Sequence, residues 1–136
     1  MERKDYLMRE IEKIALLLQS LLNFLTGNKE NLAVSIENKF EETCELLKQE
    51  TGFDFEKFLA LQGSSNKEYI KNFKGINPEN LELLAEILFQ MGQKQNFNKQ
   101  RVLFEKALLL FELCNQTDKT YSISRESKIT QIKNAL

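Results

Sequence analysis

Apolar side chains recur every three or four residues along most of the chain, and this spacing predicts helices. No segment alternates apolar and polar residues over a useful length, so no sheet is expected. The expected helices cover residues 5–25, 29–50, a short segment after Asp54, 65–73, 78–91, 99–114 and 122–136. We therefore predict an all-α fold, a helical bundle or α–α superhelix of about seven helices.

The first expected helix has the widest apolar face. Its inward positions alternate in steps of four and three, at Leu7, Ile11, Ile14, Leu18, Leu21 and Leu25. A face this wide needs more than one neighbour, either other elements of the chain or a second copy. These six residues are therefore the candidate surface for a homodimer.

Local signals place several helix starts. Asp54 and Asn77 are typical N-caps, and Pro78 suits the first turn that follows Asn77. Ser65 and Glu68 have the spacing of a capping box. The segments after 54, 65 and 77 are accordingly expected to begin new helices.

The span from Asn77 to Ala107 carries a pattern of large and small residues on two helices joined by a glycine turn. The positions are Leu81, Leu84, Ala85 and Leu88, then Gly92, then Phe104 and Ala107. This pattern resembles a tetratricopeptide-type helical hairpin, whose small residues let two antiparallel helices approach. The loop from Gln93 to Asn98 is expected to be about three residues longer than the family's turn, and Gln100 replaces a small residue.

One such hairpin cannot form a solenoid by itself, so the earlier helices must complete its core. We expect a single domain over residues 1–136, with N-terminal helices over 5–74 and the hairpin plus a final helix over 77–136. The opening Asp5-Tyr6-Leu7-Met8-Arg9-Glu10-Ile11-Glu12 is similar to the start of small bacterial proteins that end in such a hairpin. That resemblance implies no activity.

Composition narrows the classes of function. The chain has 136 residues, 42% of them hydrophobic and 29% charged, as is typical of a soluble globular domain. Its net charge of −1 gives no general attraction to nucleic acid or to an anionic membrane. The apolar stretch from Ile14 to Leu25 is interrupted by polar residues and is too short to span a bilayer. A cytoplasmic protein is expected.

The sequence offers little chemistry for catalysis. It contains no histidine, no glycine-rich phosphate loop and no nucleophile elbow. Cys44 and Cys114 fall on apolar helix faces and are expected to be buried thiols. The acidic residues Glu37, Glu41, Glu42 and Glu45 indicate a solvated helix face. We predict no enzyme, no catalytic residue, no cofactor and no metal site.

The leading hypothesis is a non-catalytic protein–protein interaction module or adaptor. In the resembled family, the free face of the first hairpin helix lines a groove for a peptide. Here that face would present Glu79, Glu82, Glu86 and Phe89, which suits a basic or amphipathic partner. The alternatives are a structural homo-oligomer joined by the N-terminal helix, or a small-molecule binder. An apolar cavity with convergent polar groups would favour the small-molecule binder.

Overall fold

The computed structural model describes residues 2–27, 33–118 and 122–136. Of the described residues 87% are helical and none lies in a strand, which confirms the all-α prediction. The described helices are α1 (Glu2–Gly27), α2 (Ala33–Thr51), α3 (Phe55–Ala60), α4 (Ser64–Asn72), α5 (Pro78–Gln93), α6 (Phe97–Asp118) and α7 (Ile123–Ala135). Within the same residues no helix has the length and apolar character needed to cross a membrane.

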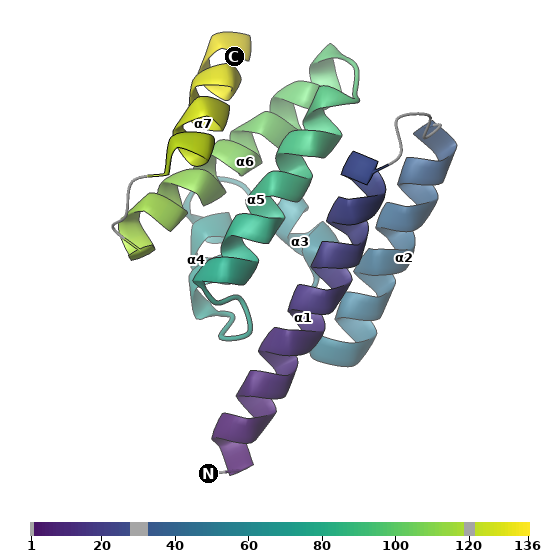
Figure 1. Ribbon diagram of the computed structural model, residues 1–136, viewed down its shortest axis with the longest axis vertical. Helices are drawn as coiled ribbons and strands as arrows, with labels where there is room; N and C mark the ends of the chain where they lie inside the picture. Colours follow the sequence, from purple (N-terminus) through teal and green to yellow (C-terminus); the bar gives the residue numbers. More distant parts are fainter. Residues whose placement is uncertain (1, 28–32, 119–121) are drawn as a thin grey trace.

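The long helices lie side by side in the order α2, α1, α5 and α6, with α7 packed on α6 (Figure 1). The two short helices, α3 and α4, lie behind them. The N-terminal end of α1 projects beyond its neighbours. One hydrophobic core runs through the bundle and includes residues of all seven helices.

The wide apolar face of α1 is buried within the fold, because α1 lies between α2 and α5. Ile14, Leu18 and Leu21 have no exposed surface, and Leu25 is 2% exposed. Two neighbouring helices therefore supply the contacts that this face needs.

Helix α5 is the central helix of the bundle and packs closely on α6. Ala85 and Ala107, the small residues of the hairpin pattern, are fully buried. A Cβ atom at Gly92 would lie 2.6 Å from two ring carbons of Phe104. Glycine is needed there for close approach, and α5 continues one residue beyond it.

The loop between α5 and α6 comprises only residues 94–96, so the prediction of a longer loop is wrong. The Asn96 side-chain oxygen accepts a hydrogen bond from the Lys99 amide at 3.3 Å, as an N-cap does, and α6 begins early. Gln100 donates from Nε2 to the Gly92 carbonyl oxygen at 3.1 Å. The large polar residue thus satisfies a carbonyl at the end of α5.

Side-chain caps define three of the other helix starts. The predicted caps Asp54 and Asn77, and also Ser122, each accept a hydrogen bond from an amide three residues later. The capping box expected at Ser65 is not formed, because α4 begins one residue earlier. Its N-cap is Gly63, which has a φ of +62° and no side chain to accept a hydrogen bond.

Aromatic side chains fix the corner formed by α3 and α4. Phe53, Phe55 and Phe58 have no exposed surface. The Tyr69 hydroxyl oxygen accepts a hydrogen bond from the Asp54 amide at 2.9 Å. These contacts hold α3 and α4 against the bundle, and they leave the outer side of α2 open.

Candidate functional site

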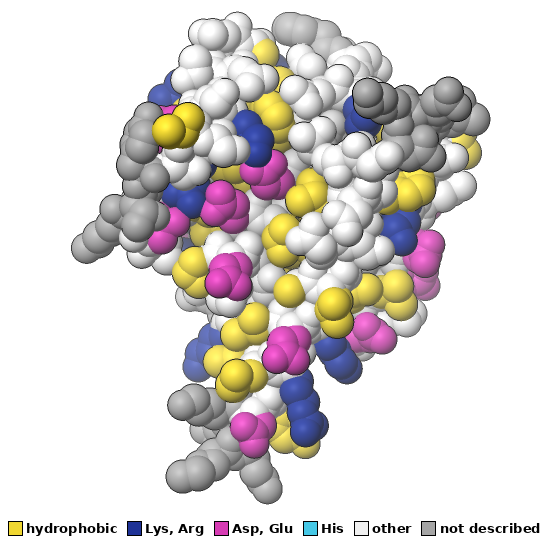
Figure 2. Space-filling model, in the orientation of Figure 1, with side chains coloured by type: hydrophobic (Ala, Val, Ile, Leu, Met, Phe, Trp, Pro, Cys, Tyr) yellow, Lys and Arg dark blue, Asp and Glu magenta, His cyan; other side chains and the backbone are white. Residues whose placement is uncertain are grey.

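The predicted peptide-binding face of α5 is only partly open. Glu79 is exposed, whereas Glu82 and Glu86 form ion pairs with α7. Figure 2 shows acidic side chains gathered over α5, with basic side chains beside them at the α7 end. Phe89 is only 3% exposed and stacks on Phe104 with 5.7 Å between ring centroids. The expectation that Phe89 extends an exposed face is therefore wrong.

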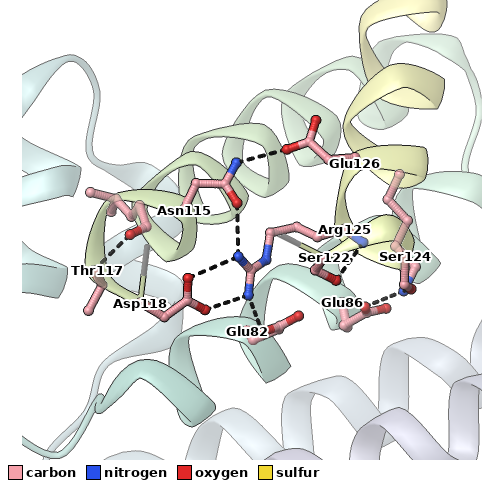
Figure 3. Close-up of polar contacts among 11 residues, drawn as sticks. Glu82, Glu86, Asn115, Thr117, Asp118, Ser122, Ser124, Arg125 and Glu126 are labelled. Carbon is pink, nitrogen blue, oxygen red and sulfur yellow. Dashed lines mark hydrogen bonds and ion pairs between the residues drawn. The ribbon is translucent and has the colours of Figure 1, made fainter. Parts of the chain in front are cut away.

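Arg125 of α7 makes the central contact with this face (Figure 3). Its Nη2 lies 2.7 Å from Glu82 Oε2 and 2.8 Å from Asp118 Oδ2. Its Nη1 donates to Asn115 Oδ1 at 2.8 Å and to Asp118 Oδ1 at 3.3 Å. The hydrogen bonds that Arg125 donates to Asp118 and Glu82 raise its pKa against the opposing effect of burial. The buried guanidinium is thereby held in its charged form.

Lys128 continues the same arrangement one helical turn later. Its ammonium group pairs with Glu86 and donates to Ser124 Oγ at 3.2 Å. Ile129 and Ile132 of α7 are buried beside these ion pairs. Two of the three acidic residues of this face, Glu82 and Glu86, are therefore paired with α7 of the same chain.

The residues predicted for self-association are divided by the fold. Ile14, Leu18, Leu21 and Leu25 are buried against α2 and α5, so they are not available on the surface of the folded chain. Leu7 and Ile11 are half-buried, and the Ile11 carbonyl oxygen accepts a hydrogen bond from Asn80 Nδ2 of α5 at 3.1 Å. If the protein forms a homodimer through α1, only the projecting N-terminal end of this helix is available as the interface.

An open groove of about 540 Å³ lies between α2 and the turn of the α5–α6 hairpin. Its apolar lining consists of Phe40, Met91, Val102 and Leu103. Its polar lining consists of Glu37 and Glu41 from α2, and of Gln95, Asn98 and Lys99 from the hairpin. Val102 is 50% exposed. Apolar surface is therefore presented to solvent between an acidic wall and a basic residue.

The acidic wall continues along α2. Glu37, Glu41 and Glu45 follow one another at steps of four and are all exposed. Within the part of the chain that the structure describes, no ion pair involves any of them. The sequence pattern of these acids indicates a solvated helix face, and the three side chains are indeed exposed. The groove beside them could not be predicted from that pattern, because its two walls lie 50 or more residues apart in the sequence.

Both thiols are buried, as predicted. Burial, with a smaller contribution from Glu56, raises the pKa of Cys44 to about 12. Burial, with a smaller contribution from Glu82, raises the pKa of Cys114 to about 12. Thiols of this kind are poor nucleophiles because the thiolate is the reactive form.

We expect neither Cys44 nor Cys114 of the native protein to react with a disulfide reagent at pH 8 within minutes. Both should react at once in denaturant, where burial no longer raises the pKa. A spectrophotometric thiol count under the two conditions checks this. A native thiol that reacts as fast as free cysteine would contradict the burial described above.

The described residues contain no group of three or more acidic or cysteine side chains arranged to hold a metal ion. Comparisons with protein-family models, with curated proteins and with solved structures find no match for this chain. The tetratricopeptide resemblance therefore stays a prediction.

Proposed function

We propose that the protein is a non-catalytic interaction module that binds a basic, amphipathic helix of a partner protein in the groove between α2 and the α5–α6 hairpin. The observation that carries the proposal is the pairing of an open apolar groove with an acidic row that makes no ion pair within the described residues. Apolar partner side chains would contact Phe40, Met91 and Val102. Partner lysines or arginines would face Glu37 and Glu41.

The contact between α5 and α7 shows how an acidic row of this chain pairs with basic side chains of a helix. There, two basic side chains at a spacing of three meet two acidic side chains at a spacing of four, and isoleucines fill the space beside them. The α2 row has the same acidic spacing at Glu37 and Glu41. A partner helix with similar spacing would match it, whereas an acidic partner would be repelled.

Two designed helical peptides of about 15 residues test this proposal, one with leucine and lysine faces and one with leucine and glutamate faces. Fluorescence anisotropy should show that the lysine peptide binds the wild type and the glutamate peptide does not. In the double variant Glu37→Lys and Glu41→Lys this preference should reverse, with stability changed by no more than about 0.5 kcal/mol. Equal binding of both peptides to both proteins would contradict the proposal.

A second pair of variants tests the apolar part of the groove. Val102→Asp should weaken binding of the lysine peptide at least about tenfold, because a carboxylate would lose water on complex formation. Val34→Asp is the matched control, since Val34 is an exposed valine of α2 that does not line the groove. Equal loss of binding in both variants would show that the groove is not the site.

A second candidate function is self-association through the projecting end of α1. It is supported by the apolar residues there, since Tyr6 is 70% and Met8 53% exposed and Leu7 is half-buried. If this end joins two copies, sedimentation should show a dimer for the wild type and a monomer for Met8→Glu. A monomeric wild type at high concentration would exclude this candidate.

A further inference from the structure

The solvent side of α1 carries a stripe of apolar and basic side chains. Tyr6, Arg9, Lys13 and Leu16 follow one another at steps of three, four and three residues, so they lie along one side of the helix. All four are exposed, Tyr6 to 70% and Leu16 to 72%. We call these four residues the α1 stripe.

The two basic residues of the α1 stripe are not neutralised by an ion pair within the described residues. Glu10 and Glu50 line the surface hollow beside Arg9 and Lys13, but neither carboxylate lies within ion-pair distance of them. The stripe therefore presents two positive charges between an aromatic and an aliphatic side chain. These are the features that the groove between α2 and the α5–α6 hairpin requires of a partner helix.

The charges of the α1 stripe also match those of the groove in spacing. Arg9 and Lys13 are four residues apart, and so are Glu37 and Glu41 on α2. Four residues correspond to about 6 Å along a helix axis, so two helices that lie side by side can bring both pairs together. The acidic pair is likewise exposed and forms no ion pair among the described residues.

The projecting end of α1 and the groove lie far apart on one molecule. In Figure 1 the N-terminal end of α1 is at the bottom, whereas the turn between α5 and α6, which forms one wall of the groove, is at the top. Helix α1 is continuous and its other side is buried between α2 and α5, so it cannot bend back onto the groove of its own chain. Contact between stripe and groove requires two copies.

We propose that the groove of one copy binds the α1 stripe of a second copy, so that the protein associates head to tail. This inference rests on the function proposed above and names the partner as another copy of this chain. Arg9 and Lys13 of one copy face Glu37 and Glu41 of the next, and Tyr6 lies against the apolar lining of the groove. Every assembly then keeps one free groove and one free stripe, so further copies can add.

Analytical ultracentrifugation of the wild-type protein over a range of concentrations tests the association. The average mass should rise with concentration and exceed that of a dimer. Excess leucine–lysine peptide should return it to the mass of a monomer, because the peptide occupies the groove. A wild type that stays monomeric up to about 1 mM, where even a weak contact is populated, would overturn the inference.

Two variants test whether the contact joins unlike surfaces. Tyr6→Asp blocks the stripe and Val102→Asp blocks the groove, so each variant alone should be monomeric. Their mixture should form a dimer and nothing larger, because it offers one working stripe and one working groove. Ile123→Asp is the matched control, since Ile123 is 76% exposed on α7, and it should associate as the wild type does. If Val102→Asp alone still dimerises, the contact is a symmetric one between α1 ends and the inference is wrong.

Binding of the leucine–lysine peptide separates this inference from the function on which it rests. If the peptide binds in the groove while the wild type stays monomeric, the groove serves another partner and only the head-to-tail contact is excluded. If the peptide does not bind, the proposed function itself fails, and this inference fails with it.

Discussion

Replacing Leu18 by alanine is expected to lower the free energy of unfolding by about 2 to 5 kcal/mol. Leu18 has no exposed surface and lies at the centre of the α1 face that α2 and α5 enclose. The loss combines the transfer of buried methyl groups with the cavity that remains, because close-packed helices relax only partly. Urea denaturation followed by circular dichroism measures the change.

Leu16→Ala is the matched control for this experiment. Leu16 lies on the same helix but is 72% exposed, so its replacement should change stability by no more than about 0.5 kcal/mol. Leu18→Asp should prevent folding, since it buries an unpaired carboxylate. Equal effects of Leu16→Ala and Leu18→Ala would contradict the packing of α1.

The second large effect concerns the attachment of α7. The double variant Glu82→Gln and Asp118→Asn should cost about 2 kcal/mol, because it leaves the buried Arg125 guanidinium without a charged partner. A fully buried pair would cost about 3 to 5 kcal/mol, but both acids are about one-third exposed and water reaches them. Hydrogen exchange should accelerate in α7 before it accelerates in α1.

The exposed pair of Arg101 and Glu105 supplies the control. Glu105→Gln breaks an ion pair of similar length, 3.2 Å, on the surface of α6, and should cost less than about 0.5 kcal/mol. If the double variant lowers the free energy of unfolding no more than Glu105→Gln does, the Arg125 network does not hold α7 in place.

The sequence predicted the helices well because local signals agreed with the apolar spacing. Asp54 and Asn77 are caps in the structure, and the inward positions of α1 from Ile14 onward are buried. Two local predictions were wrong for local reasons. Asn96 starts α6 early and shortens the hairpin loop, and Gly63 takes the cap position ahead of Ser65.

The candidate site could be predicted less well than the helices, because it depends on which helices pack against one another. Phe89 was assigned to an exposed face on the assumption that α5 has one buried stripe. In the fold α5 lies between α1 and α6, so Ile87 and Phe89 are buried as well as Leu88. A run of apolar residues around most of α5 was the available signal of that central position.

The sequence predicts that the acidic row of α5 suits a basic partner, but nothing in the row itself indicates that Glu82 and Glu86 pair with α7 of the same chain. The pairing depends on where the chain places α7 after the end of α6. The open groove likewise depends on the fold, which places Phe40 of α2 across from residues of the distant hairpin.

An NMR titration of the wild-type protein with the leucine–lysine peptide tests the central proposal most directly. The account predicts that methyl signals of Met91 and Val102 shift with increasing peptide, while amide signals of Ser124 and Lys128 in α7 stay in place. Shifts confined to α7 and to Glu82 and Glu86 would contradict it. They would show that a partner helix displaces α7 from α5 and leaves the groove on α2 empty.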